Sequence, residues 1–156
     1  MVDAASQVIV AHDLVTSGSD AGQLLAMVDA VEAMAGARPK EVSADAGYCS
    51  EANLAGLDER DLRGYIATGR QKHGTKAAVA KHSSGSRLIK RMSAKLKRAG
   101  YRSRYRLRKQ VVEPVFGQIK QARGFRQFLL RSIEKVRAEW ALICTAHNLT
   151  KLLNPA

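Results

Sequence analysis

Two kinds of hydrophobic pattern alternate along this chain. Short runs rich in β-branched residues predict strands, and stretches whose apolar residues recur every three or four positions predict amphipathic helices. Their order from the amino terminus is strand, helix, strand, helix, strand, which is typical of a mixed or parallel sheet covered by helices. The strands are predicted over residues 7–14, 41–44 and 64–68, and the intervening helices over residues 24–34 and 50–60.

The carboxyl-terminal half predicts three more helices. A short basic helix is indicated by apolar residues four positions apart (Leu88, Met92 and Leu96). A second helix is expected to begin close to Glu113, because proline is tolerated only near a helix start and Pro114 follows directly. A last helix, capped by Ser132, has a broad apolar face that reaches Leu152.

Length and composition narrow the class of protein. At 156 residues the chain is expected to form a single domain with a real core. No apolar run approaches the roughly 20 residues of a membrane span, and no basic start followed by an apolar run indicates a signal peptide. The cysteines, Cys49 and Cys144, lack the spacing of a zinc site. We therefore expect a reduced cytosolic protein with no structural metal and no membrane partner.

One segment carries all of the excess positive charge. The net charge is +12, and residues 70–109 hold 15 of the 26 basic residues and no acidic residue, so the remainder has 11 basic against 14 acidic residues. A surface so one-sided favours a polyanion such as nucleic acid, through neutralisation of phosphates. The alternative is a disordered basic tail. Residues 69–85, rich in Lys, His, Ser and Gly, are expected to form a loop.

Three acidic residues stand out by position. Asp3 and Asp45 lie at predicted strand ends, and Glu113 lies at a predicted helix start. Open α/β sheets place their chemistry at the carboxyl ends of strands. Converging carboxylates supply the oxygen ligands that Mg²⁺ prefers, and paired ions support phosphoryl transfer. The alternative is that Glu113 and Lys120 are solvated residues of a surface helix. A chain with 14 acidic residues also offers many sets of three acids by chance.

Three strings carry a resemblance to a known family: VSADAGY (residues 42–48), VVEPVFGQIK (111–120) and EWALICTAHNL (139–149). They resemble the C-terminal part of the DDE transposases of bacterial insertion sequences, which have an RNase H-like core, and the resemblance covers nearly the whole chain. It implies that Asp45 is the second catalytic Asp and Glu113 the catalytic Glu. It also implies that Asp3 is the first catalytic Asp and that the three acids bind Mg²⁺ or Mn²⁺.

The same family has a signature of Tyr, two residues, Arg, three residues, Glu, six residues and Lys. Glu113 and Lys120 keep the last spacing, whereas Lys109 stands at the Arg position and Arg106 at the Tyr position. By the resemblance, Lys120 contacts a phosphate near the transposon end. Tyr101 and Tyr105, which are interleaved with arginines, either stack on bases or pack on the core. The other candidates for DNA contact on this surface are Tyr105, Arg106, Arg108 and Lys109.

The resemblance predicts an α/β fold with an RNase H-like core, in which a mixed sheet is flanked by helices. Residues 1–156 are expected to form one catalytic-domain fragment, with a basic loop and helix over residues 69–110 inserted before the Glu-bearing helix. Family members have a complete strand ahead of the first Asp, so we expect the first strand of this chain to be truncated. We therefore expect DNA binding with poor cleavage.

The predicted function is metal-dependent strand cleavage and strand transfer at insertion-sequence ends. DNA, at the transposon ends and the target, is the expected partner of a homodimer in the bacterial cytoplasm, associated with the nucleoid. An alternative is a non-catalytic DNA-binding fragment that regulates or inhibits full-length transposase. A third interpretation is an unrelated basic protein that binds RNA.

Overall fold

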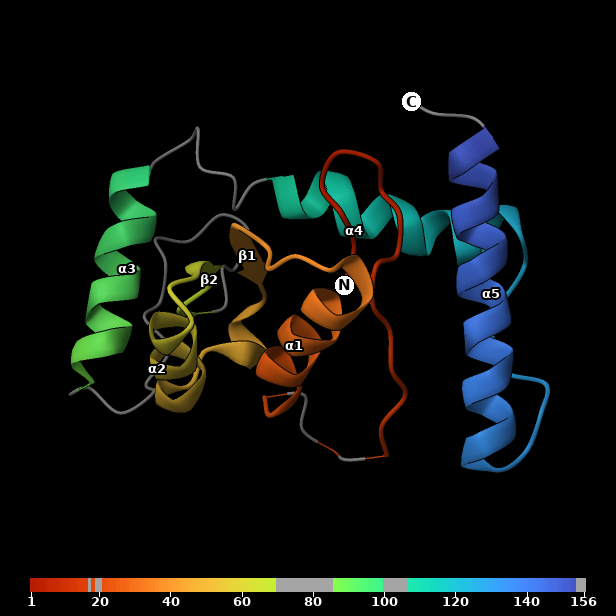
Figure 1. Cartoon of the computed structure of the whole chain (residues 1–156), viewed down its shortest axis with the longest axis horizontal. Coiled ribbons are helices and arrows are strands. Elements are labelled where there is room, and N and C mark those ends of the chain that lie inside the picture. The colour runs from red at the N-terminus through yellow and green to blue at the C-terminus, as the bar shows by residue number, and fades with distance from the viewer. Residues whose placement is uncertain (17, 19–20, 70–85, 100–106, 154–156) are drawn as a thin grey trace.

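The computed structural model describes residues 1–16, 18, 21–69, 86–99 and 107–153, with the backbone alone at residues 99 and 107–109 (Figure 1). Within them, helices pack around a small sheet, so the predicted mixed α/β class is confirmed. The longer elements are α1 (Gln23–Ala35), β1 (Glu41–Ala44), α2 (Glu51–Glu59), β2 (Arg63–Ile66), α3 (Arg87–Ala99), α4 (Leu107–Gly117) and α5 (Ile133–Leu153). The predicted loop at residues 70–85 lies outside the described residues.

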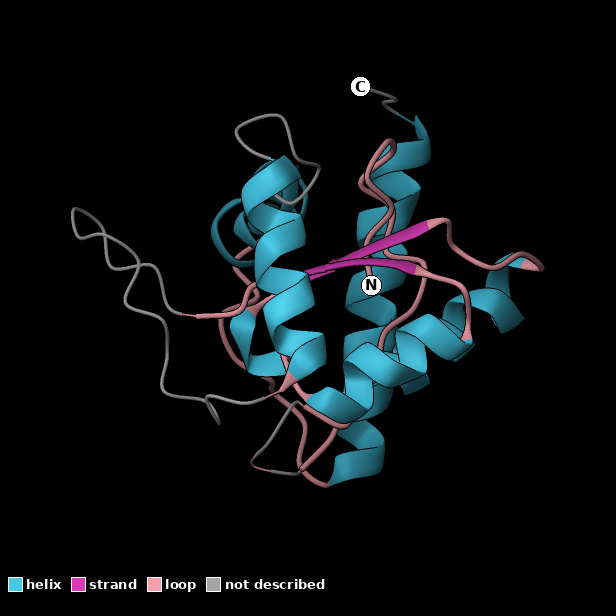
Figure 2. Ribbon diagram, turned by 90° about the vertical axis from the view of Figure 1, so that its left-hand side faces the viewer, coloured by secondary structure: helices cyan, strands magenta, loops and turns pink. Residues whose placement is uncertain are grey.

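The described sheet consists of two parallel strands, which lie side by side in Figure 2. In their register Val42 faces Gly64 and Ala44 faces Ile66, and the Ala67 amide extends the ladder by donating to the Ala44 carbonyl at 3.2 Å. These strands match the predictions over residues 41–44 and, within two residues, 64–68. With α1, α2 and α3 they enclose a first hydrophobic cluster. Its buried members are Leu24, Val28, Val42, Ala44, Leu54, Leu57, Leu62, Ile66 and Met92.

The helices of this cluster have the boundaries that local signals predict. Gly36 ends α1 with φ +66°, a left-handed conformation that glycine adopts without steric cost. Ser50 caps α2, because its hydroxyl accepts a hydrogen bond from the Asn53 amide at 3.2 Å. The N-cap of α1 is Gly22.

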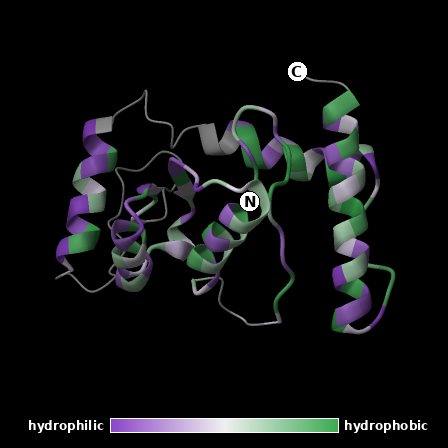
Figure 3. Ribbon diagram, viewed as in Figure 1, coloured by the Kyte–Doolittle hydropathy of each residue, from purple (hydrophilic) through white to green (hydrophobic). Residues whose placement is uncertain are grey.

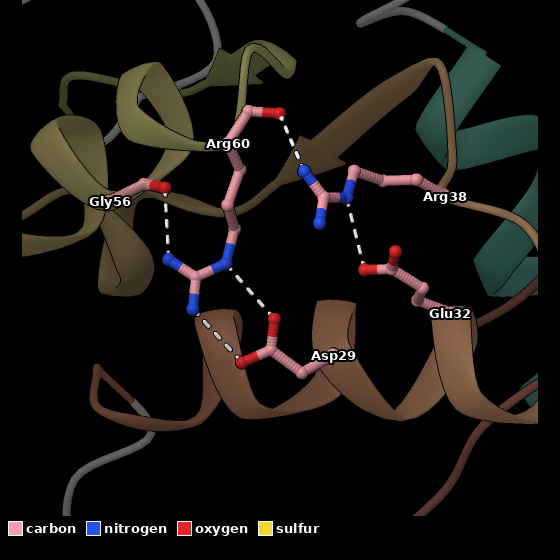
Figure 4. Close-up of polar contacts among 5 residues, drawn as sticks. All are labelled: Asp29, Glu32, Arg38, Gly56 and Arg60. Carbon is pink, nitrogen blue, oxygen red and sulfur yellow. Dashed lines mark hydrogen bonds and ion pairs between the residues drawn. The ribbon is translucent and has the colours of Figure 1, made fainter.

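Polar contacts join α1 to the end of α2 (Figure 4). Arg60 donates two parallel hydrogen bonds of 2.9 Å to the carboxylate of Asp29 and a third, of 3.1 Å, to the Gly56 carbonyl. Arg38 pairs with Glu32 at 3.0 Å and donates to the Arg60 carbonyl. A two-pronged arginine–carboxylate pair fixes direction as well as distance, so it sets how α1 lies against α2.

The strand predicted over residues 7–14 is wrong. The segment instead forms a short hairpin with residues 1–3, closed by a single antiparallel bridge between Val2 and Ile9. Backbone bonds also join the two arms of this hairpin, from the Asp3 amide to the Val8 carbonyl at 2.8 Å and from the Val10 amide to the Met1 carbonyl at 3.0 Å. Side chains of α5 bond the backbone of Ile9 and Gln7. Asn148 accepts from the Ile9 amide at 2.8 Å and donates to the Ile9 carbonyl at 2.9 Å, as a neighbouring strand would. The Gln7 carbonyl contacts the ring of His147.

The predicted start of α4 near Glu113 is also wrong, because the helix begins at Leu107 and contains Pro114. Proline has no amide to donate to the carbonyl four residues earlier, that of Gln110. The side-chain amide of Gln7 donates to this carbonyl instead, at 3.2 Å. After Gly117 the chain widens into a π-helical turn, η4 (Gln118–Ala122), and Gly124, two residues beyond it, has φ +74°.

A second hydrophobic cluster joins α4, η4 and α5 to the amino-terminal hairpin. Its buried members are Ile9, Val115, Ile119, Ile143 and Cys144. Met1 packs against the first cluster, whereas Val2 packs against the second, so the hairpin connects the two. Helices α3 and α5 lie at opposite ends of the long axis of the molecule (Figure 1). None of the described helices is long and apolar enough to cross a membrane.

Candidate functional site

A cavity of about 490 Å³ lies between the two hydrophobic clusters. Its walls come from the amino-terminal segment, from Leu24 and Met27 of α1, from the carboxyl end of β1, from residues 112–116 and from Trp140 of α5. Most of this lining is apolar, and carboxylates occur where β1 and α4 reach the cavity. Parts of the chain distant in sequence therefore form one concave surface, the usual setting of a ligand or active site.

Asp45 is delivered to this cavity by the end of β1. It follows Ala44 directly, is exposed, and precedes the short 3-10 turn η1 (Ala46–Tyr48). The Asp45 carbonyl accepts a hydrogen bond from the Tyr48 amide at 3.0 Å, which folds the chain back immediately after the acid. The predicted place of Asp45, at the carboxyl end of a strand before a turn, is confirmed.

Glu113 lines the same cavity from α4. It is exposed, and it lies on the helix between the half-buried Val112 and Pro114. The apolar residues around it serve both the core and the cavity. Val115 and Ile119 are buried in the second cluster, and Val112, Val115 and Phe116 line the cavity.

The structure places Asp3 in the turn of the amino-terminal hairpin, and Asp3 is not part of the cavity lining. Its carboxylate accepts hydrogen bonds from the Ala5 amide at 3.1 Å, from the Ser6 amide at 2.8 Å and from the Ser6 hydroxyl at 2.7 Å. These bonds, led by that of the Ser6 hydroxyl, hold the pKa of Asp3 below its ordinary value. The Asp3 carboxylate thus stabilises a local turn.

Two titratable residues of the cavity wall, His12 and Asp13, were not among those singled out from the sequence. Asp13 accepts from the Leu14 amide at 2.7 Å and lies 3.6 Å from the guanidinium of Arg137. The ring of His12 meets Trp140 edge to face, with centroids 6.4 Å apart. Their position at the carboxyl end of the run predicted over residues 7–14 is the signal by which the sequence could have indicated them.

Aromatic rings form the side of the cavity nearest α5. Phe116 and Trp140 are nearly parallel, with ring centroids 6.3 Å apart and planes 6° apart. Phe128 meets Trp140 edge to face at 6.2 Å. The ammonium of Lys120 lies 5.8 Å from the centre of the Phe116 ring, which places a cation beside the wall that carries Glu113.

The other predicted DNA contacts cannot be placed as side chains. Arg108 and Lys109 lie in the first turn of α4, where the structure describes the backbone alone. Tyr105 and Arg106 lie outside the described residues. Lys120 is thus the member of the predicted DNA-binding set whose side chain is placed.

The acids of the cavity fit a divalent cation in part. Carboxylate oxygens are the donors that Mg²⁺ and Mn²⁺ prefer, and Asp45 and Glu113 face one cavity. In the part of the chain that the structure describes, no three His, Cys, Asp or Glu side chains gather closely enough to hold one ion. The donor chemistry fits at Asp45 and Glu113 and does not fit at Asp3, whose carboxylate is bonded within its own turn.

The chain matches a family model described as "Transposase DDE domain" over residues 67–153, which is more than half of its 156 residues. The matched span contains Glu113 and Lys120 and begins after Asp45. No curated protein and no solved structure matches the chain.

Proposed function

This chain belongs to the transposase DDE domain family, and on that premise we propose that it acts in metal-dependent cleavage and strand transfer of DNA at the ends of a bacterial insertion sequence. The observation that carries the proposal is the convergence of Asp45 and Glu113, from β1 and α4, on one cavity. In this proposal residues 1–156 form a single domain with an RNase H-like core. Residues 69–110 are its basic insertion, and the protein works as a homodimer on DNA in the bacterial cytoplasm, at the nucleoid.

DDE transposase domains generally use divalent metal ions. We propose Asp45 and Glu113 as the residues that hold Mg²⁺ or Mn²⁺ here. For Asp3 to join them as the third acid, its carboxylate would have to leave its bonds to Ala5 and Ser6 in the hairpin turn. A bound cation supplies positive charge where negative charge develops on a phosphodiester. The chain's own residues contribute position: β1 holds Asp45 at a strand end, and α4 holds Glu113 on a helix anchored by Val115.

Lys120 supports the DNA side of the proposal. Its ammonium lies against Phe116, a wall residue of the cavity that Glu113 also lines, so a cation stands beside this wall for a phosphate to meet. Tyr105, Arg106, Arg108 and Lys109 are proposed to extend this surface. Because α4 begins at Leu107, the two basic residues at 108 and 109 belong to the same helix as Glu113.

A nicking assay on supercoiled DNA that carries the element's ends tests the proposal. We expect cleavage with Mg²⁺ that EDTA abolishes, and a loss of at least about a hundredfold in the rate for Asp45→Asn and for Glu113→Gln. Matched controls are Asp61→Asn and Glu59→Gln, exposed acids outside the cavity lining, which should keep the wild-type rate. Asp3→Asn completes the series. If Asp3 is a third metal ligand, this variant should lose cleavage. If Asp3 only stabilises the turn, the variant should lose thermal stability and keep cleavage.

A second candidate function is a non-catalytic DNA-binding regulator of transposase. It is favoured by the absence, among the described residues, of three potential metal ligands near one point. It predicts DNA binding that EDTA and substitutions at Asp45 and Glu113 leave unchanged, together with inhibition of an active transposase added to the same assay. Nicking that depends on both acids rejects this candidate.

A further inference from the structure

Helix α3 has a basic face and an apolar face on opposite sides. Its apolar side chains, Leu88, Ile89, Met92 and Leu96, pack against the first cluster. At 3.6 residues per turn, positions 87, 90, 94, 97 and 98 lie on the far side of the helix from Met92, and all five are exposed. Figure 3 shows the hydrophilic colour along this helix. Four of the five exposed positions are Arg or Lys: Arg87, Lys90, Lys97 and Arg98.

The charge of this strip is not neutralised within the described protein. Helix α3 contains no acidic residue, and the nearby Asp58 of α2 forms its ion pair with Arg91. Lys95 is turned inward, where its ammonium donates to the Gly64 carbonyl at 2.9 Å and lies 4.5 Å above the Tyr65 ring. No described carboxylate pairs with any of the four strip residues. A row of unneutralised cations attracts a polyanion.

The length of the strip suits duplex DNA. From residue 87 to residue 98 a helix rises about 16 Å, at about 1.5 Å per residue. The major groove of duplex DNA is about 12 Å wide, so a strip of this length can meet phosphates on both sides of it. Lys and Arg side chains on one helical face reach such phosphates without reading base edges, which gives affinity independent of sequence.

The position of the apolar face argues against a lipid surface as the partner. A helix that binds a membrane inserts its apolar side among the acyl chains. In α3 that side is occupied: Met92 is 9% exposed and belongs to the first cluster, with Leu88 and Leu96 packed beside it. The outer face therefore offers charge alone, which suits phosphates in water.

The strip is also separate from the cavity that holds Asp45 and Glu113. No residue of α2, β2 or α3 lines that cavity. In Figure 1, α3 lies at one end of the molecule, beyond α2 and the sheet, whereas α4 lies between it and α5. A ligand on the strip would therefore not occupy the cavity.

We propose that Arg87, Lys90, Lys97 and Arg98 form a phosphate-binding strip that holds duplex DNA apart from the cavity of Asp45 and Glu113. The proposal rests on the proposed function in taking DNA as the partner, and it assigns a second DNA surface to the protein. Through this strip the chain retains DNA when the stretch at the cavity is released. Binding at the strip is independent of sequence and falls steeply with salt.

The test is fluorescence anisotropy of a labelled random-sequence duplex, titrated with the full chain over a series of salt concentrations. Combining Arg87→Ala, Lys90→Ala and Lys97→Ala should reduce the slope of log affinity against log salt by roughly 2 to 3, about 0.9 for each phosphate that is no longer neutralised. Alanine favours helix, so circular dichroism should show α3 retained. The matched control removes equal charge from exposed residues elsewhere, by Lys40→Ala, Arg131→Ala and Lys135→Ala, and should change the slope by less than about one.

Other results of this experiment would overturn the proposal. An equal loss in the control means that net charge alone matters. Wild-type binding by the strip variant rejects the strip and leaves the proposed function standing, whereas a wild type that binds no duplex rejects both. Asp45→Asn and Glu113→Gln should lose nicking with an unchanged slope, which separates the two surfaces. Strip-dependent binding to phosphatidylserine vesicles, or to duplex RNA in preference to duplex DNA, assigns the strip to a different partner.

Discussion

Gln7 connects three elements by itself. Its side-chain amide donates to the Gln110 carbonyl of α4, its side-chain oxygen accepts from Lys151 of α5 at 2.7 Å, and its backbone carbonyl contacts the ring of His147. It does this with φ +58°, a left-handed conformation that a residue with a Cβ adopts at a steric cost. The contacts offset that cost, because they give a partner to the carbonyl that Pro114 leaves open.

Two substitutions at this residue separate the bonds from the backbone conformation. Gln7→Ala removes two side-chain hydrogen bonds and should lower the free energy of unfolding by about 1–2 kcal/mol. Gln7→Gly removes the same bonds and also the left-handed strain, so it should be as stable as Gln7→Ala or more stable, by up to about 1 kcal/mol. Urea unfolding of the three proteins measures both effects. A glycine variant clearly less stable than the alanine variant would contradict the assignment of strain.

His147 gives the fold a pH dependence. The residue is fully buried, and burial lowers its pKa, helped by the positive charges of Arg123 and Lys151 and opposed by the bond to the Gln7 carbonyl. A carbonyl only accepts, so Nε2 carries the hydrogen of that bond, and Nδ1 has no hydrogen-bond partner among the described residues. The folded protein therefore favours the neutral ring.

The sign of the effect follows from proton linkage. In the unfolded chain the ring titrates near its ordinary value of about 6.5, so below that pH the unfolded state binds a proton that the folded state resists. The stabilisation is complete above about pH 6.5 and declines as the pH falls from there towards the lower folded pKa. Denaturant unfolding at a series of pH values should show this decline in the wild type and a flatter profile in His147→Gln. Parallel profiles would assign the dependence to other groups.

At the scale of elements, local signals predict the helices that local interactions determine. The left-handed Gly36 and the hydroxyl of Ser50 act within a few residues, and α1, α2 and α3 lie where such signals place them. The failures have a different cause. Within residues 7–14, the Ile9 amide bonds to Asn148, 139 residues away along the chain. Helix α4 continues through Pro114 because the side-chain amide of Gln7 donates to the carbonyl that the proline leaves open.

The candidate site could likewise be predicted only where local signals determine it. Asp45 follows a strand whose pattern is local, so its position could be predicted, and Glu113 could be recognised from the string around it. Their meeting at one cavity depends on how α4 crosses the end of β1, which no local pattern records. Asp3 follows Val2, which pairs with Ile9, but its carboxylate is bonded to Ala5 and Ser6 within the hairpin turn and does not line the cavity. The Asp3→Asn variant tests whether Asp3 also serves the site.

The two hydrogen bonds between the Asn148 side chain and the Ile9 backbone should stabilise the fold as a pair of sheet hydrogen bonds would. Replacing Asn148 by Leu removes the partner of both the amide and the carbonyl of Ile9, a residue that is 8% exposed. Leaving two buried backbone groups unpaired should lower the free energy of unfolding by roughly 2–4 kcal/mol and speed hydrogen exchange at the Ile9 amide. The control is Thr145→Leu on the exposed side of α5, expected to change stability by less than about 0.5 kcal/mol.

At the scale of the whole molecule, the described residues form two separate hydrophobic clusters. The cavity of about 490 Å³ lies between them, and the amino-terminal hairpin connects them through Met1 on one side and Val2 on the other. Clusters joined so sparsely can open separately, because opening one leaves most of the packing of the other in place. The arrangement also puts Asp45 with the first cluster and Glu113 with the second, so the candidate site depends on their relative position.

We therefore expect unfolding in two steps, and the single tryptophan can distinguish them. Trp140 packs against the second cluster, so its fluorescence follows that cluster, whereas far-ultraviolet circular dichroism follows the helices of both. Leu57→Ala should destabilise the first cluster by about 2–5 kcal/mol. The dichroism phase of that cluster should then shift to a lower midpoint, while the fluorescence midpoint stays in place. Ile143→Ala in the second cluster should do the reverse. If either substitution moved both probes by the same amount, the clusters would form one cooperative unit, and the hairpin would couple Asp45 to Glu113 rigidly.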